Sequence, residues 1–202
     1  MKIGIINYEA GNLQSVYNSI YNLGYDPIVI NNKQELRNID KLIIPGVGSA
    51  NLAIKTLEQN GLKEEIINFY EKEKYVLGIC LGFQIFAKKL FENGLSNGLE
   101  IVDGDVIQIS KDRSSNIGWY DVDLKKNDFI QIDKKYSSFY FCHSYYVKLN
   151  SETENQYCLG EIKLDNNVIP SFYRKKNFFG TQFHPEKSQF NGLKIIQTFL
   201  DY

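Results

Sequence analysis

The stretch Gly78-Ile79-Cys80-Leu81-Gly82-Phe83-Gln84 decides the fold, because it joins an apolar run to a helical pattern through a cysteine between glycines. Residues 75–77 are apolar and predict a buried strand, and residues 83–90 predict a helix. A strand that turns sharply into a helix at a cysteine, with a glycine two residues to either side, is typical of a nucleophile elbow. The glycines allow a strained chain to pass close to its neighbours.

An elbow of this kind would raise the sulfur of Cys80 out of the sheet and place it at the N-terminus of the next helix. Backbone N–H groups and the helix dipole favour a thiolate over a thiol there. The N–H of Leu81 would point to the place where an oxyanion forms on a substrate. The alternative interpretation of Cys80 is a small buried apolar residue, as free cysteines commonly are.

The composition indicates an ordinary globular protein. The 202 residues, 43% of them hydrophobic and 23% charged, suffice for a single domain over 1–202. A net charge of −1 gives no electrostatic case for nucleic acid or an anionic membrane. No signal peptide or bilayer-spanning run is expected. The cysteines Cys80, Cys142 and Cys158 lack metal-ligand spacing, so we expect no metal, and free thiols favour a cytoplasmic location.

The first half of the chain alternates strands and helices, which predicts a mostly parallel sheet covered by helices on both faces. The expected strands are 2–7, 28–30, 41–44 and 75–79, and the expected helices are 11–23, 50–57, 62–70 and 83–90. Ligands of such α/β sheets bind at the carboxyl ends of the strands, where the loop 45–48 and the elbow both lie.

Short β-like runs dominate after residue 95 and are followed by a last helix over 192–200. The runs cover residues 100–109, 119–124, 139–141, 145–149, 157–163, 168–174 and 178–183. We expect them to add antiparallel strands to the same sheet. The sequence therefore predicts a three-layer α/β fold with an antiparallel extension in its second half.

A thiolate nucleophile needs a base, and the base needs a group that orients it. His184 precedes Pro185, which should keep the segment out of a helix, so that His184 and Glu186 point to the same side. Glu186 could then accept a hydrogen bond from one imidazole nitrogen while the other faces Cys80. The alternative is a solvated His-Pro-Glu turn in a surface loop.

The loop Pro45-Gly46-Val47-Gly48 follows an expected strand. Its glycines would let a backbone N–H turn towards an acyl oxygen. One donor from Gly46, Val47 or Gly48, together with the N–H of Leu81, would form an oxyanion hole. We expect at least one of these N–H groups to be turned away in the resting state. The alternative is an ordinary turn after a strand.

The motif Gly-x-Cys-Leu-Gly-x-Gln at 78–84 and Phe-His-Pro-Glu-Lys-Ser at 183–188 resemble the class I, or triad-type, glutamine amidotransferases. Within that family, residues 10–13, 45–48, 118–119 and 141–145 look like the glutaminase subunit of imidazole glycerol phosphate synthase. The resemblance spans essentially the whole chain. It implies a flavodoxin-like fold and hydrolysis of L-glutamine to glutamate and ammonia through a thioester, without a cofactor. The implied catalytic triad is Cys80, His184 and Glu186.

The resemblance also implies a substrate site and a partner. Gln84 matches a glutamine-binding residue, and the stretch His143-Ser144-Tyr145 matches a segment that contacts substrate largely through its backbone. A half-exposed helix position for Gln84 and a structural role for His143 are the alternatives.

The chain shows no nucleotide-binding loop or other acceptor site of its own. The resemblance implies that the partner is a (β/α)8-barrel cyclase. That partner would use the ammonia to turn the ribulosyl nucleotide PRFAR into imidazole glycerol phosphate and AICAR. Asn12, Trp119 and Lys187 match positions near that interface. An exposed Trp119 would suit a hot spot, whereas a buried core tryptophan is the alternative.

Two departures from the family pattern keep other functions open. The family usually reads Pro-His-Met-Gly-Trp-Asn where residues 115–120 read Ser-Asn-Ile-Gly-Trp-Tyr, and Phe83 stands where methionine is usual. A diverged homologue that supplies ammonia for amidino sugars of surface glycans is therefore an alternative. A stand-alone cysteine amidohydrolase and an inactive binding subunit are two more; Gln84 argues against the first, and the intact triad against the second.

Overall fold

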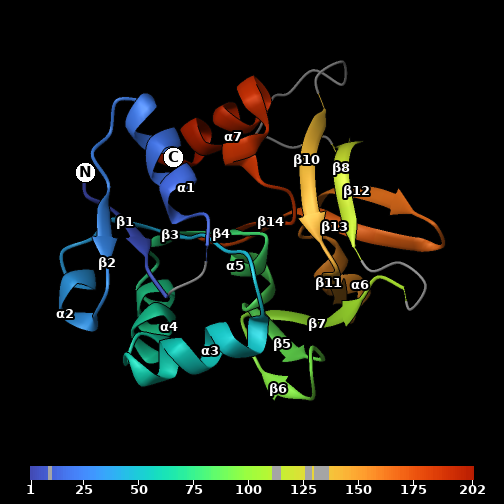
Figure 1. Ribbon diagram of the computed structural model, residues 1–202, viewed down its shortest axis with the longest axis horizontal. Coiled ribbons are helices and arrows are strands. Elements are labelled where there is room, and N and C mark those ends of the chain that lie inside the picture. Colours follow the sequence, from blue (N-terminus) through green and yellow to red (C-terminus); the bar gives the residue numbers. More distant parts are fainter. Residues whose placement is uncertain (9–10, 111–114, 126–128, 130–136) are drawn as a thin grey trace.

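The computed structural model describes residues 1–8, 11–110, 115–125, 129 and 137–202; Ala10 of the segment 10–13 lies outside the described residues. Eight strands form one mixed sheet in the order β2-β1-β3-β4-β14-β13-β12-β9 (Figure 1). The five parallel strands are β1 (Ile3–Ile6), β2 (Ile28–Ile30), β3 (Lys41–Ile44), β4 (Tyr75–Ile79) and β14 (Phe178–Thr181). The antiparallel extension consists of β13 (Asn167–Lys175), β12 (Cys158–Leu164) and β9 (Asp123–Leu124), as predicted.

Helices cover both faces of this sheet, which confirms the predicted three layers (Figure 1). One face packs against α1 (Leu13–Asn22) and α7 (Gln189–Asp201), with a core that includes Val16, Ile43 and Ile196. The other face packs against α3 (Ala50–Gln59) and α4 (Lys63–Glu71), with a core that includes Leu57, Leu42 and Ile66. Three single-turn helices complete the chain: α2 (Lys33–Leu36), α5 (Leu81–Gln84) and α6 (Glu152–Asn155).

Not every β-like run of the second half joins the main sheet, so that part of the expectation was wrong. Strands β10 (Ser138–His143) and β8 (Asn116–Asp121) form an antiparallel pair of their own. A four-stranded sheet contains β11 (Tyr145–Leu149), β7 (Val102–Gln108), β5 (Ala87–Leu90) and β6 (Ser96–Asn97). Both small sheets flank the carboxyl end of β4, and they therefore supply walls around the elbow (Figure 1).

The expected helix over 83–90 was also wrong, because α5 ends at Gln84 and residues 87–90 form strand β5. The side chains from Ile85 to Ala87 are fully buried, so this run is apolar on every side. Its backbone is bonded across the chain instead of along a helix, with Leu99 N–H donating to Ile85 C=O at 2.7 Å. Periodicity alone does not separate a buried strand from a buried helix in such a run.

The elbow depends on two backbone contacts that only glycine allows. A Cβ on Gly82 would lie 1.9 Å from the carbonyl oxygen of Ile44, at the end of β3. A Cβ on Gly78 would lie 2.5 Å from the carbonyl oxygen of Gly82. The turn is therefore packed backbone against backbone.

The helices of the described residues are all too short or too polar to cross a lipid bilayer.

We expect Gly82→Ala to destabilise the fold strongly, because backbone atoms of two elements would have to separate. The free energy of unfolding should fall by about 3 kcal/mol or more in urea titrations. Gly61→Ala is the control: Gly61 has a positive φ of 64°, but a Cβ there would meet nothing nearer than 3.7 Å. That control should cost only the conformational strain, about 1 kcal/mol. Equal losses in the two variants would contradict the role of the close contact.

Candidate active site

Cys80 lies between β4 and α5 in a backbone conformation that L-residues rarely adopt, with φ 53° and ψ −103°. Its N–H donates to the carbonyl of Thr181 on β14 at 2.6 Å, which anchors the turn to the neighbouring strand. The residue is 4% exposed. Such strain persists only where the surroundings hold it, as they do at functional turns.

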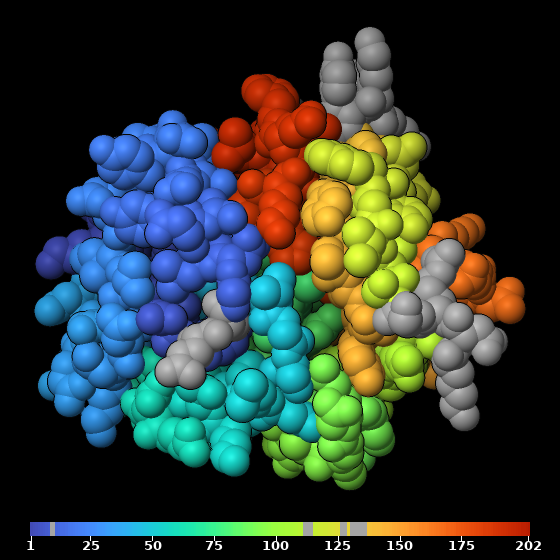
Figure 2. Space-filling view, viewed as in Figure 1, coloured from blue at the N-terminus to red at the C-terminus, as the bar shows by residue number. Residues whose placement is uncertain are grey.

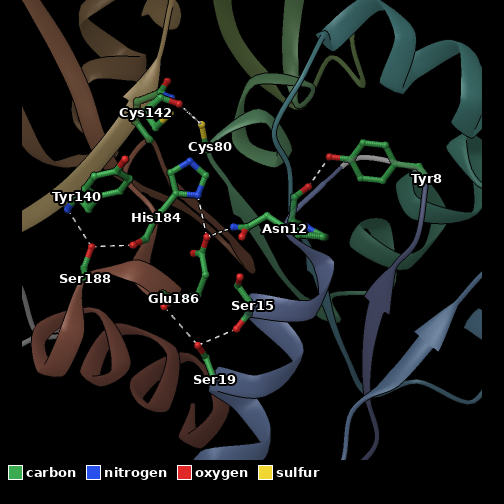
Figure 3. Close-up of polar contacts among 12 residues, drawn as sticks. Tyr8, Asn12, Ser15, Ser19, Cys80, Tyr140, Cys142, His184, Glu186 and Ser188 are labelled. Carbon is green, nitrogen blue, oxygen red and sulfur yellow. Dashed lines mark hydrogen bonds and ion pairs between the residues drawn. The ribbon is translucent and has the colours of Figure 1, made fainter. Parts of the chain in front are cut away.

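His184 and Glu186 form a buried pair beside this cysteine. The Nδ1 atom of His184 donates to Oε1 of Glu186 at 2.8 Å, and both side chains are fully buried. Figure 3 shows the imidazole ring between Glu186 and Cys80, with its other nitrogen turned towards the sulfur. That nitrogen, Nε2, has no hydrogen-bond partner among the described residues.

The segment does not reach this arrangement in the predicted way. His184 itself is extended, but residues Pro185–Lys187 form a 3-10 turn, η2. Proline is well suited to the first turn of a helix, where its missing N–H is not needed. The turn, rather than an extended chain, therefore brings the carboxylate of Glu186 back to the ring of His184.

The charges around His184 favour an imidazolium. Burial by itself lowers the pKa of His184, but the negative charges of Cys80 and Glu186 outweigh it and raise that pKa to about 11. A proton on His184 and a thiolate at Cys80 stabilise each other. The surroundings of His184 therefore favour its protonated form beside Cys80.

Asn12 was expected near a partner interface, and the structure also brings it to the triad. Its side-chain N–H donates to the same Oε1 atom of Glu186 that accepts from His184 (Figure 3). Asn12 precedes α1 with a φ of 78°, a conformation that asparagine tolerates better than most residues. The carboxylate is thereby fixed from two sides, while its Oε2 has no partner among the described residues.

A cavity of about 230 Å³ opens beside the sulfur. Its walls are formed by the loop after β3, the elbow, and the link between β10 and β11. In Figure 2 the surface is hollowed between the cyan and orange segments. The lining residues are Val47, Gly48, Cys80, Leu81, Gln84, Glu92, Cys142, His143, Ser144 and Tyr145. The predicted substrate residues and three of the four oxyanion residues thus border one space.

Gly46, the fourth oxyanion candidate, lies behind the cavity. A Cβ on Gly46 would lie 2.3 Å from the hydroxyl of Tyr8 and 2.7 Å from Cβ of Leu81. Tyr8 donates from that hydroxyl to the carbonyl of Pro45, and burial raises its pKa. The loop is therefore clamped at its start, while Gly48 has a φ of 115° and open space around it. That a resting N–H of this loop is turned away stays a prediction.

Gln84 and His143 are both buried and both bind the carbonyl of Tyr145. Nε2 of Gln84 donates to it at 2.7 Å, and Nδ1 of His143 donates to it at 2.8 Å. Nε2 of His143 faces the side-chain nitrogen of Asn116 at 3.2 Å and so accepts from it. Burial, aided by the charge of His184 and opposed by the Tyr145 carbonyl, lowers the pKa of His143 to about 4. This geometry favours the structural alternative for His143.

Sequence reasoning missed two residues of the site. Glu92 is the acidic side chain of the cavity wall, and its Oε2 accepts from the N–H of Ala50 at 2.6 Å, at the start of α3. Gln182 places its side-chain nitrogen 3.5 Å from the sulfur of Cys80. Neither belongs to a periodic pattern, so only its proximity in the fold identifies it. No cluster of three metal-binding side chains occurs in the described part of the chain.

The remaining interface candidates form an exposed patch next to His184. Trp119 is 47% exposed, so the alternative of a buried core tryptophan was wrong. Ile117, two residues earlier on β8, is exposed on the same side. The ring of Tyr140 lies 6.0 Å from that of Trp119, and the ammonium of Lys187 lies 6.0 Å from the Tyr140 ring. We call Ile117, Trp119, Tyr140 and Lys187 the β8 patch.

The lowered pKa of His143 predicts acid sensitivity. As pH falls from about 6.5 towards 4, the unfolded chain takes up a proton at this residue and the folded chain does not, so stability is lost with falling pH. The loss at pH 5 relative to pH 7 should be about 2 kcal/mol. His143→Asn removes the titrating group, and urea titrations at the two pH values should show the loss shrinking by that amount. An unchanged difference between pH 7 and pH 5 would refute the assignment.

Comparison with known proteins agrees with this geometry. Residues 4–201 match the family model described as glutamine amidotransferase class-I. The imidazole glycerol phosphate synthase subunit HisH of Caldanaerobacter subterraneus subsp. tengcongensis is 41% identical, with 98% of this chain and 96% of the relative covered. HisH of Methanocaldococcus jannaschii is 39% identical, and HisH 1 of Campylobacter jejuni strain 81-176 is 37% identical, each with 98% of both chains covered.

Solved structures show the same fold at lower identity. A glutamine amidotransferase crystal structure matches with a TM-score of 0.75 at 18% identity, covering 98% of this chain and 97% of the other. PurLQS from Thermotoga maritima matches with a TM-score of 0.75 at 18% identity, covering 100% and 98%. With a cysteine elbow, a buried histidine–glutamate pair and these full-length relatives, the chain belongs to the class I glutamine amidotransferases, in the group of HisH subunits.

Proposed function

We propose that this chain is the glutaminase subunit of an imidazole glycerol phosphate synthase. It hydrolyses L-glutamine to glutamate and ammonia and passes the ammonia to a (β/α)8-barrel cyclase, which makes imidazole glycerol phosphate and AICAR from PRFAR. The observation that carries the proposal is the strained Cys80, set in one cavity wall with His184 and Glu186 buried behind it. The names and full-length similarity of the HisH relatives support the same reading.

The first half of the reaction forms a thioester between Cys80 and the glutamyl group. The thiolate of Cys80 attacks the carboxamide carbon of glutamine, and the carbonyl electron pair moves to the oxygen. The N–H of Leu81, the first of α5, has no partner within its own helix and suits that oxyanion. A second donor comes from the loop N–H of Val47 or Gly48, which line the same cavity.

Proton transfer by His184 completes both halves. Its Nε2 gives a proton to the leaving nitrogen as the C–N bond breaks, so that ammonia departs and a glutamyl thioester remains. The now neutral ring takes a proton from water, whose oxygen attacks the thioester and releases glutamate with the Cys80 thiolate restored. Glu186 accepts from Nδ1 throughout and holds the ring in place, with Asn12 steadying the carboxylate.

The cavity wall suits an amino acid as substrate. The carboxylate of Glu92 provides a counter-charge for the α-ammonium group of glutamine. Gln84 and the backbone of Ser144 and Tyr145 border the region that the side chain of the substrate would fill. Because Tyr145 C=O already accepts from Gln84 and His143, this part of the wall is held in shape before substrate arrives.

The β8 patch is the surface proposed for the cyclase. It combines exposed apolar and aromatic side chains with a lysine, a composition that suits interface hot spots. The ring of Tyr140 in this patch lies 6.5 Å from that of His184, which protonates the leaving nitrogen, so a partner seated there would lie close to the ammonia. Asn116, where the family usually has histidine, is 1% exposed and bonded to His143, so this departure lies behind the patch. The free thiols of the chain suit the cytoplasm, where we place the reaction.

The test is glutamine hydrolysis by the purified chain, alone and with the histidine-pathway cyclase of the same organism and PRFAR. We expect weak activity alone, strong stimulation in the mixture, and a loss of at least about a thousandfold in Cys80→Ala. Cys158→Ala is the matched control, because Cys158 is buried in β12, where its thiol bonds the carbonyl of Gly160. That variant should retain stimulated activity.

Each other outcome identifies a different function. Without stimulation, but with an intact fold and a reactive Cys80, the acceptor enzyme is another barrel and the amidino-sugar pathway becomes the better proposal. Full activity without any partner would identify a stand-alone amidohydrolase. Glutamine hydrolysis that persists in Cys80→Ala would rule out the thioester mechanism.

A further inference from the structure

A fully buried glutamine, Gln182, lies beside the sulfur of Cys80 and has no part in the steps above. Its side-chain Nε2 is 3.5 Å from Sγ of Cys80, within range for an N–H donor and sulfur. Its Oε1 is 3.2 Å from Nε2 of Gln84. Buried side-chain amides are hydrogen-bonded almost without exception, so these two contacts account for its position.

The direction of this chain of amides is set by a backbone carbonyl. Tyr145 C=O can only accept, so Gln84 must present its nitrogen there, at 2.7 Å. The same nitrogen lies against Gln182, which must therefore present its oxygen. If the Gln182 amide were flipped, its nitrogen would face the nitrogen of Gln84, and its oxygen would face the sulfur of Cys80. The group that faces Cys80 is consequently an N–H donor.

We propose that Gln182 is a positioning residue, which donates a hydrogen bond to the Cys80 thiolate and links it to the cavity through Gln84. The inference rests on the proposed function only in taking Cys80 as the nucleophile. A neutral thiol would instead donate, and the carbonyl of Cys142 lies 3.8 Å from Sγ for that purpose. An N–H aimed at the sulfur favours the anion, because only the anion is a good acceptor.

The link to the cavity gives this contact a second consequence. Gln84 borders the cavity, and one hydrogen bond joins it to Gln182. A substrate that contacts Gln84 therefore acts on the donor of the thiolate through one intermediate amide. The path from the cavity to the sulfur consists of Gln84 and Gln182.

The experiment measures alkylation of Cys80 by iodoacetamide against pH, with peptide mass spectrometry to separate Cys80 from Cys142 and Cys158. Gln182→Leu removes the donor at similar volume. The apparent pKa of Cys80 should rise by about one unit, which slows alkylation about tenfold at pH values below it. An unshifted profile in a folded Gln182→Leu protein would overturn the proposal.

The matched control is Thr181→Val, at the neighbouring position. Its hydroxyl is also fully buried, and it has no hydrogen-bond partner among the described residues. We expect its alkylation profile to equal that of the unmodified chain. The other titratable groups around the sulfur stay in place in both variants: His184, Glu186, His143, Glu92, Cys142 and Tyr8.

A second measurement needs no variant that could fail to fold. In the unmodified chain, selectively labelled with [¹⁵N]glutamine, the side-chain amide signals of Gln182 should shift as Cys80 titrates. Signals that stay constant across that titration would also overturn the proposal. Neither measurement uses glutamine hydrolysis or a partner. If the chain shows no glutaminase activity but Gln182→Leu still shifts the pKa of Cys80, the proposed function falls and this inference stands.

Discussion

The close approach of Gly82 to the end of β3 is the constraint on which the rest of the site depends. With no side chain at that position, the elbow lies directly against the carbonyl of Ile44, and the loop that leaves β3 must run beside Cys80. Gly46, in the loop after β3, also lies so close to its neighbours, Tyr8 and Leu81, that a side chain would not fit. Residues of two separate loops, Val47 and Gly48 from one and Leu81 from the other, therefore border one cavity.

Buried charge is the second organising feature. A buried carboxylate and imidazolium lose hydration, and they are tolerated only where partners replace the water. Glu186 obtains such partners from Asn12 at the start of α1 and from His184 after β14. The network joins the segment before α1 to the segment after β14, beside the elbow. The buried charges therefore find their partners only when these parts of the fold have come together.

Local patterns identified much of this architecture. Each of these signals lies within a few residues and can be recognised in the sequence: the near-continuous apolar strands 41–44 and 75–79, the glycines around Cys80, and the histidine with its glutamate. The failures share a physical cause. Residues 85–87 are apolar and fully buried, and hydrogen bonding to distant segments makes residues 87–90 a strand. The 3-10 turn after His184 likewise follows from its contacts with the rest of the chain, not from proline alone.

The contacts of Asn12, Glu92 and Gln182 could not be predicted from the sequence, because they also join distant parts of the chain. Asn12 meets a carboxylate 174 residues away, and Gln182 meets an amide 98 residues away. Their residue types are common in loops and carry no periodic signal. Only the order of strands places them at the elbow, and that order is a property of the whole sheet.

The order of strands in the sheet differs from the order in which the strands are synthesised. Strand β14 lies between β4 and β13, so a segment synthesised long after β4 occupies the middle of the sheet. Until it arrives, β4 has an open edge and the amide of Cys80 lacks its acceptor, Thr181. His184 and Glu186 arrive with the same segment. The strand that closes the edge of β4 and the residues that orient the base of Cys80 thus belong to one continuous segment of the chain.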